Sequence, residues 1–208
     1  MLNVENPILV ARGIKRCFPM PGGEPFYALK GVDIAAPRGR LTILKGKSGS
    51  GKTTLMNILG ALDQPTEGTV EFDGREITSM SEKELTRLRR FEIGFVFQSV
   101  ALIPIMTALE NVEFVLRLGR YPGDRRARAI ECLEMVGLAE RESHMPAQMS
   151  GGEQQRVAIA RAIAHQPKLI FADEPTGALD TNTAINVVKI FKELCAAQGV
   201  SIVMTTHD

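Results

Sequence analysis

The chain has 208 residues, 44% of them hydrophobic and 5% aromatic, with a formal net charge of +1 at pH 7. This length suits one domain with a sizeable core, and the near-neutral charge argues against nucleic acid as a partner. No apolar run is long enough to cross a bilayer, and the N-terminus lacks the basic region of a signal peptide. The widely spaced cysteines, Cys17, Cys132 and Cys195, fit no metal site and suit a reducing compartment.

The first third of the chain reads as short strands around one helix. A Pro/Gly-rich turn separates the first two strands, and the fourth strand ends at Asp73-Gly74, which is typical of a hairpin. The expected strands are 8–18, 26–34, 40–44 and 69–72, and the expected helix is 54–59. Hairpin signals here predict an antiparallel sheet beside a parallel one.

The rest of the chain alternates helices with apolar strands. The expected helices are 81–90, 107–118, 124–136, 150–165 and 182–197, and the expected strands are 93–97, 168–174 and 200–205. Ser81 and Glu84 have the spacing of a capping box at the start of the first of these helices. The two consecutive helices over 107–136 indicate a helical insert within an α/β core.

A glycine-rich loop lies between the strand at 40–44 and the helix at 54–59. Its sequence is G-x-x-x-x-G-K-T, the phosphate-binding Walker A motif. Glycines let backbone N–H groups surround a phosphate, and the helix N-terminus adds unpaired donors. We expect Lys52 to reach the β- and γ-phosphates and the Thr53 hydroxyl to bind Mg²⁺. The expected nucleotide-binding residues here are Gly46, Ser48, Gly49, Ser50, Gly51, Lys52, Thr53 and Thr54.

Two acids end the buried strand at 168–174, as in a Walker B motif. A parallel strand delivers such residues to the carboxyl edge of the sheet, where open α/β sheets bind ligands. We expect Asp173 to hold Mg²⁺ and to contribute to the nucleotide site. We expect Glu174 to be catalytic, orienting or deprotonating the water that attacks the γ-phosphorus.

Gln98 and His207 each follow a predicted strand directly. A neutral amide at Gln98 can bind Mg²⁺ or hold the attacking water without adding charge. An imidazole at His207 can bond a γ-phosphate or hold Glu174 in place. Both are expected to be catalytic, and Gln98 also to be a metal ligand, although an isolated Gln or His is more often an ordinary surface residue.

A second anion site is expected at residues 149–156, Met-Ser-Gly-Gly-Glu-Gln-Gln-Arg. Ser150 can cap a helix, while Gly151 and Gly152 leave the first backbone N–H groups exposed. One ATP needs only one phosphate cradle. The second cradle therefore indicates a nucleotide held by another copy of the chain.

In these motifs the chain resembles the ATP-binding-cassette (ABC) ATPases over essentially its full length. Gln98 matches the Q-loop, residues 150–154 the signature, 177–180 the D-loop and His207 the H-loop. Met149 stands where the family usually has leucine. Residues 108–112 and 173–180 more narrowly resemble the lipoprotein-release, macrolide-efflux and antimicrobial-peptide-resistance group, with the cell-division ABC ATPase as a near neighbour.

The resemblance implies an α/β fold with a P-loop NTPase core sheet, an antiparallel β layer and a helical subdomain near 99–150. We expect one nucleotide-binding domain over residues 1–208, with a C-terminal helix and strand pair of its relatives missing. The family stacks adenine on an aromatic near the N-terminus. Phe18 is the candidate, with Phe26 and Tyr27 as rivals.

The resemblance further implies an ATPase subunit using ATP and Mg²⁺. Its expected partners are a second copy, in an ATP-sandwich dimer, and a transmembrane permease at the cytoplasmic face of the membrane. Export or extraction of a substrate is the first hypothesis. The alternative is a mechanical or signalling module of the cell-division type, without transport. Residues 100–106 are either core or a contact with the partner, and the basic clusters at 87–90 and 125–128 suit solvated helix faces.

Overall fold

A four-stranded parallel sheet forms the centre of the computed structural model, which describes residues 4–207; residues 1–3 and 208 lie outside it. The strands, in spatial order, are β3 (Leu41–Lys45), β8 (Ser201–Thr206), β7 (Leu169–Ala172) and β6 (Ile93–Val96). Every residue of β7 is buried. A strand covered on both faces is apolar throughout, which is why β7 reads as a continuous hydrophobic run.

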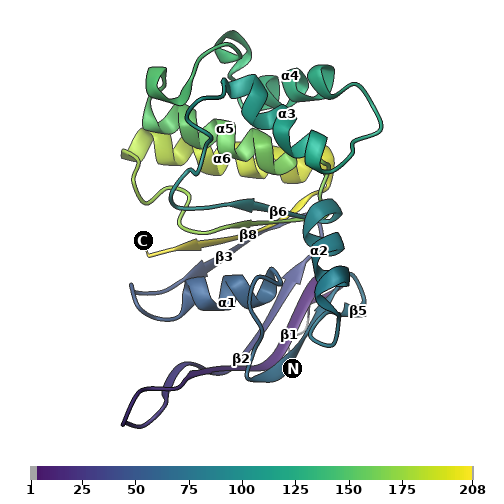
Figure 1. Cartoon of the computed structure of the whole chain (residues 1–208). Coiled ribbons are helices and arrows are strands. Elements are labelled where there is room, and N and C mark those ends of the chain that lie inside the picture. The colour runs from purple at the N-terminus through teal and green to yellow at the C-terminus, as the bar shows by residue number, and fades with distance from the viewer. Residues whose placement is uncertain (1–3, 208) are drawn as a thin grey trace.

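A second sheet is antiparallel and lies below the first (Figure 1). Its strands, in spatial order, are β2 (Phe26–Pro37), β1 (Pro7–Phe18), β4 (Glu67–Phe72) and β5 (Arg75–Glu76). Asp73 and Gly74 join β4 to β5 with φ of 49° and 75°. Two consecutive left-handed residues suit the turn of a tight hairpin, so the predicted hairpin and antiparallel sheet are confirmed.

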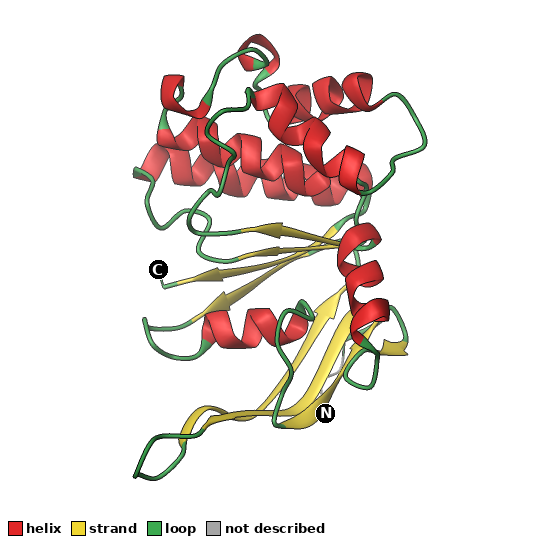
Figure 2. Ribbon diagram, in the orientation of Figure 1, coloured by secondary structure: helices red, strands yellow, loops and turns green. Residues whose placement is uncertain are grey.

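Helices cover both faces of the parallel sheet (Figure 2). One helix lies between the two sheets, and four helices form the layer on the other side. The helices are α1 (Lys52–Leu59), α2 (Glu82–Phe91), α3 (Ala108–Leu118), α4 (Arg125–Met135), α5 (Gly151–Ile163) and α6 (Thr181–Gln198). The helix between the sheets is α1, and the layer consists of α3 to α6 (Figures 1 and 2). The predicted α/β fold with an antiparallel sheet is confirmed.

The parallel sheet separates two hydrophobic cores. Ile170 and Ile202 point into the core shared with α3 to α6, whereas Phe171 and Val203 point into the core shared with α1 and the antiparallel sheet. This alternation follows from the two-residue period of a strand. The central strands therefore fix the positions of the helical layer and of the antiparallel sheet. The loops that follow these strands lie between the two cores.

Several predicted boundaries differ from the structure by one to three residues. Strand β7 ends at Ala172. The chain turns out of the sheet after it, since Glu174 has a left-handed φ of 43°. Helix α5 ends at Ile163, where the buried Arg128 guanidinium donates to the carbonyls of Ile163 and Ala164. The capping box at Ser81 and Glu84 is present as predicted.

All three cysteines are free thiols. Burial raises the pKa of Cys132 to about 12 and that of Cys195 to about 11. Both thiols therefore remain protonated and act as small apolar core groups. Within residues 4–207, no helix combines the length and apolar character that crossing a membrane requires.

Candidate functional site

Most of the predicted site residues gather at the carboxyl edge of the parallel sheet, on the left in Figure 1. Gly46 follows β3, Gln98 comes two residues after β6, Asp173 follows β7 and His207 follows β8. These residues are far apart in sequence. Because all four strands are parallel, the residues that follow them meet at one edge.

The glycine-rich loop depends on its glycines at specific points. Gly49 and Gly51 have φ of 77° and 88°, the left-handed region that glycine adopts without strain. A Cβ atom on Gly51 would lie 2.7 Å from the carbonyl oxygen of Ala28, and one on Gly46 would lie 2.8 Å from Ser50 Oγ. The loop therefore folds tightly against β2, and side chains at these positions would force it open.

Helix α1 differs from the other α-helices of the described chain in how it begins. The other five each start with a side chain that accepts a hydrogen bond from a backbone N–H group of the first turn: Ser81, Thr107, Asp124, Ser150 and Asp180. Helix α1 starts at Gly51 without such a side chain. Its first N–H groups and the positive end of its dipole therefore suit an external anion.

Lys52 lies at the start of α1 with a largely buried side chain. Its ammonium group donates to the carbonyls of Gly46 at 2.6 Å and Lys47 at 3.0 Å. The same Nζ atom lies 3.5 Å from Glu174 Oε1. These contacts place the positive charge over the loop and beside Glu174, two residues after β7, where phosphate oxygens would meet it.

The two acids after β7 are held by a residue that the sequence did not single out. The buried Thr205 hydroxyl donates to Asp173 Oδ1 at 2.6 Å and accepts the backbone N–H of Glu174 at 2.9 Å. A polar residue directly after the apolar residues 202–204, two positions before His207, was the only signal that the sequence offered.

Glu174 is the centre of the remaining contacts. Its Oε2 atom lies 3.4 Å from His207 Nδ1, while its Oε1 atom faces Lys52. A Cβ atom on Gly177 would lie 3.6 Å from both Gln98 Nε2 and Glu174 Oε2. Gln98 and Glu174 therefore flank the same glycine. The structure brings together four predicted residues: Lys52, Gln98, Glu174 and His207.

Thr53 and Asp173 face a common space. Both line a cavity of about 270 Å³ between α1, β6 and β7, whose other walls include Phe95, Phe97 and Phe171. One hydroxyl and one carboxylate thus line the same, otherwise mainly apolar, hollow. Oxygen donors of this kind are the ligands that Mg²⁺ prefers.

The second predicted cradle is a well-formed helix start. Ser150 Oγ accepts the N–H of Glu153 at 3.2 Å, and Glu153 accepts the N–H of Ser150 at 2.8 Å. Hydrogen bonds from Ser150, helped by Arg141, lower the pKa of Glu153. Gly151 is open, but a Cβ on Gly152 would clash with the Thr183 methyl group, a packing reason that the sequence did not indicate.

The two cradles are not connected within one chain. Among the described residues, no hydrogen bond or ion pair joins Ser150, Gly151 or Gly152 to the loop at 46–54 or to Asp173. The backbone atoms of Ser150 and its capping partner bond only locally. The structure therefore leaves the signature segment outside the group of residues around Glu174.

The three candidate aromatics lie together at the open end of the β1–β2 pair. Phe18 is paired with Phe26, and Cys17 with Tyr27, and all three aromatic residues are exposed. The Arg16 guanidinium lies 4.8 Å from the centre of the Phe18 ring and bonds Asp63, which follows α1. Phe18 is thus on the face of β1 that turns toward α1. On the paired strand β2, Ala28 contacts the loop at Gly51.

A strand, a glycine-rich loop and an uncapped helix, with acids at the end of a neighbouring strand, define a P-loop nucleotide-binding protein. Comparison with known proteins makes the class more specific. Residues 29–177 match the ABC transporter family. The chain belongs to this family and is one of its ATP-binding, ATP-hydrolysing cassettes.

Individual relatives agree with the narrower group that the sequence predicted. The chain is 45% identical to the lipoprotein-releasing system ATP-binding protein LolD 2 of Caulobacter vibrioides, covering 99% of this chain and 90% of that protein. It is 49% identical to the macrolide export ATP-binding/permease protein MacB of Marinobacter nauticus over 97% of this chain, but spans only 31% of that longer protein.

A solved structure shows the same architecture. The ABC transporter ATP-binding protein MJ0796 of Methanocaldococcus jannaschii is 50% identical over 90% of this chain and 82% of its own length. Its dimeric post-hydrolysis structure with ADP and Pi superimposes with a TM-score of 0.86, at 45% identity, over 96% of this chain and 88% of that chain.

Proposed function

We propose that the loop at 46–54 holds the phosphates of the ATP that the chain hydrolyses, together with Mg²⁺. The uncapped N-terminus of α1 and the tight glycine turn supply backbone donors for phosphate oxygens. Lys52 neutralises the β- and γ-phosphates from its position over the loop. Phe18 stacks on adenine. It lies at the end of β1, and the paired strand β2 contacts the loop through Ala28.

Thr53, Gln98 and Asp173 are the proposed Mg²⁺ ligands, Asp173 through the metal's water shell. The described residues hold no group of three or more His, Cys, Asp or Glu side chains placed to bind a metal. Mg²⁺ in nucleotide sites keeps several waters and is held largely by substrate phosphates, so a set with one carboxylate suits it. The ion's chemistry here is neutralisation of phosphate charge.

Glu174 is the proposed residue that orients or deprotonates the attacking water. The observation that carries this role is its position: one carboxylate oxygen lies by Lys52 and the other by His207, with Gln98 across Gly177. His207 and Gln98 then hold Glu174 and the water in place.

Ser150, Gly151 and Gly152 are proposed to close on ATP bound by a second copy. They form a helix start with no bonds to the nucleotide loop of their own chain, and the structure of MJ0796 with ADP and Pi is dimeric. Backbone N–H groups stabilise γ-phosphate charge most strongly when water is excluded, as on dimer closure.

A groove on the chain suits a permease. A cavity of about 440 Å³ lies between β6, α3 and α5, with Phe97, Ile103, Phe114, Val115 and Leu118 among its lining residues. Asn111, almost fully buried, donates its amide to the carbonyls of Ile103, Met106 and Thr107 and so fixes the loop after Gln98. In that loop Ile105 is 81% exposed. A permease bound in this groove would therefore contact the loop that follows Gln98.

The proposed cellular role is that of an ATPase subunit at the cytoplasmic face of a membrane, driving export or extraction through this permease. The names of the LolD 2 and MacB relatives support transport. The signalling module of the cell-division type is not favoured by these relatives.

Mixing two inactive variants tests the shared site. Glu174→Gln and Ser150→Arg homodimers each carry a defect at both sites. In a mixed dimer both defects fall in one site and the other site is intact, so ATPase activity should partly return. No recovery, with native mass spectrometry showing that heterodimers formed, would mean that Ser150 serves its own chain or that one intact site cannot turn over. The Ser150→Arg/wild-type heterodimer distinguishes these, because it contains one intact site under either arrangement.

A further inference from the structure

The strand ladder between β7 and β8 ends one step before the acids that the proposed function uses. The last paired residues are Ala172 and Met204. Beyond them the chain turns, and Glu174 adopts a φ of 43°, a left-handed conformation that is uncommon for a residue with a side chain. Something must hold this conformation if the carboxylate is to stay between Lys52 and His207.

The Thr205 side chain continues the ladder at this point. Its hydroxyl accepts the N–H of Glu174 at 2.9 Å and donates to Asp173 Oδ1 at 2.6 Å. Thr205 is fully buried, so neither bond is weakened by competition with bulk water. One oxygen atom therefore fixes the backbone of one acid and the side chain of the other.

We propose that Thr205 is a positioning residue for hydrolysis, an inference that rests on the roles proposed above for Asp173 and Glu174. The bond to Oδ1 sets the orientation of the Asp173 carboxylate toward the cavity that it shares with Thr53. The bond from the Glu174 N–H keeps that residue in its left-handed conformation. Thr205 itself touches neither reacting atom. It acts by coupling the two acids, so that they hold their places together.

Substitutions that separate the hydroxyl from the rest of the side chain test this role. Thr205→Val keeps the shape and removes the hydroxyl, whereas Thr205→Ser keeps the hydroxyl and removes a methyl group. Loss of a group that orients metal or catalytic ligands typically lowers activity by about 10- to 100-fold. We expect such a fall in kcat for Thr205→Val at saturating ATP and Mg²⁺, and near-normal kcat for Thr205→Ser.

A packing role predicts the opposite order. If Thr205 only filled space, Val would preserve activity and Ser would lose it, and this result would overturn the proposal. Should Thr205→Val fail to fold, Thr205→Ala can be compared with Thr205→Ser, since these two differ only in the hydroxyl. Equal kcat in the folded Ala and Ser variants would equally overturn it.

Ser201 provides a matched control on the same strand. Its buried hydroxyl accepts the N–H of Gly39 at 2.8 Å at the opposite end of β8. Ser201→Ala also removes one hydrogen bond to a buried hydroxyl of β8, but at the end of the strand that is far from Asp173 and Glu174. We expect its kcat to stay within about twofold of wild type. A fall in kcat equal to that of Thr205→Val would show a general effect of loosening β8 and would contradict the positioning role.

Two readouts do not depend on turnover. Amide hydrogen exchange should show faster exchange of the Glu174 N–H in Thr205→Val than in wild type and Thr205→Ser. Mn²⁺ binding in the presence of ADP, followed by electron paramagnetic resonance, should weaken by about 10-fold or more in Thr205→Val. Unchanged exchange and Mn²⁺ affinity would overturn the proposal. Failure of the proposed function itself would instead appear as normal ATPase activity in Glu174→Gln.

Discussion

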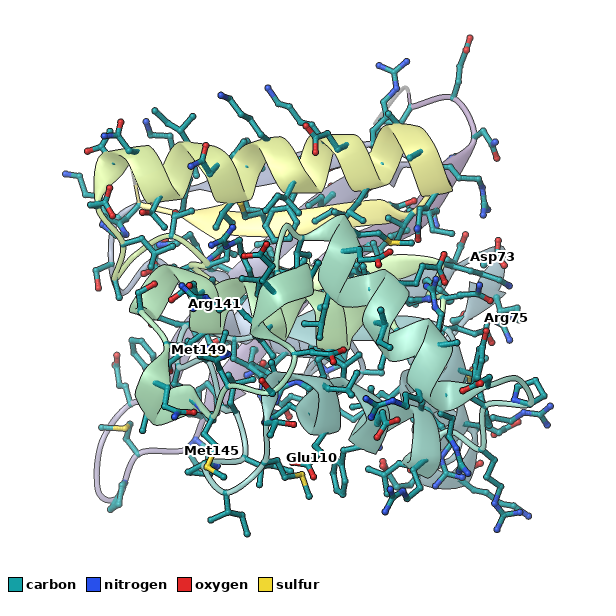
Figure 3. All side chains as sticks on the ribbon, turned by 90° about the horizontal axis from the view of Figure 1, so that it is seen from above. Asp73, Arg75, Glu110, Arg141, Met145 and Met149 are labelled. Carbon is teal, nitrogen blue, oxygen red and sulfur yellow. The ribbon has the colours of Figure 1, made fainter. Side chains whose placement is uncertain are left out.

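The two edges of the parallel sheet carry similar residue types in different arrangements. At the amino edge, Lys168 bonds two carboxylates, Asp73 at 2.7 Å and Glu92 at 2.9 Å. Arg38 and Arg75 complete this group with bonds of 2.6 and 2.7 Å to Asp73 and Glu92. Asp73 and Arg75 lie close together on the right in Figure 3. Both acids of this group are matched by cations.

At the carboxyl edge the charged groups are arranged as in a ligand-binding site and do not form a closed network of ion pairs. Lys52 makes its short bonds to backbone carbonyls, and the contacts of the Glu174 carboxylate with Lys52 and His207 are longer, at 3.5 Å and 3.4 Å. The difference teaches that a lysine near an acid does not by itself indicate function. Short, mutually satisfied ion pairs stabilise the fold, whereas loosely paired groups beside an uncapped helix suit binding and chemistry.

The largest expected effect is at Glu174. Glu174→Gln should lower ATP turnover by roughly 10²–10⁴-fold because the amide cannot accept a proton from water. ATP affinity should stay near wild type, since the amide has the same size. Turnover and equilibrium nucleotide titration check both expectations. Wild-type turnover would contradict a catalytic role for Glu174 at the carboxyl edge. Gln98 would then be the next candidate for the residue that positions the attacking water.

Lys52→Ala should come next. Removing one charged donor from phosphate should raise the dissociation constant for ATP by about 10- to 100-fold. Isothermal titration measures this directly. The matched variant is Lys168→Ala at the opposite edge, which should leave ATP affinity unchanged. Equal losses in the two lysine variants would show that the edges do not differ in the way proposed.

Phe18→Ala should have a smaller effect. Loss of stacking on adenine should raise the dissociation constant for ATP by about 5- to 10-fold. Phe26→Ala and Tyr27→Ala are the controls, because both side chains are exposed at the same strand ends. If Tyr27→Ala weakens binding and Phe18→Ala does not, the choice of residue is wrong.

Asp73→Asn should affect stability and leave catalysis alone. Its partners are partly exposed, so solvent screens these ion pairs, and the loss should be about 1 kcal/mol of unfolding free energy. Urea denaturation measures the loss, and ATPase turnover should remain at the wild-type value. A fall in turnover without a fall in stability would contradict the structural role of the amino edge.

The same variant makes a pH-dependent prediction. Hydrogen bonds from Lys168, and then from Arg38, lower the pKa of Asp73 below its usual value of 3.8. A lowered pKa in the folded state stabilises the protein above pH 3.8 and loses this contribution as the pH falls through the lowered value. The stability difference between wild type and Asp73→Asn should therefore shrink below pH 3.8. A constant difference would mean that the charge of Asp73 is unimportant.

Sequence alone determined the fold class, the order of most of the elements and the position of the glycine-rich loop. These features are local: strand and helix periodicity, a hairpin turn at Asp73-Gly74, and glycines at fixed spacing before Lys52. The residues that follow parallel strands meet at one edge whatever the details of packing. Gln98, Glu174 and His207 were therefore identifiable before the structure placed them together.

Only the tertiary structure decided which polar groups work together. Thr205 joins Asp173 to Glu174, and Gly152 is small because Thr183 lies against it, although nothing local in the sequence relates these pairs. The same holds for Lys168 and Lys52, two lysines beside acids whose roles differ by the partners that the fold supplies. Hydrogen bonds and close contacts act over a few ångströms, and sequence separation does not fix such distances.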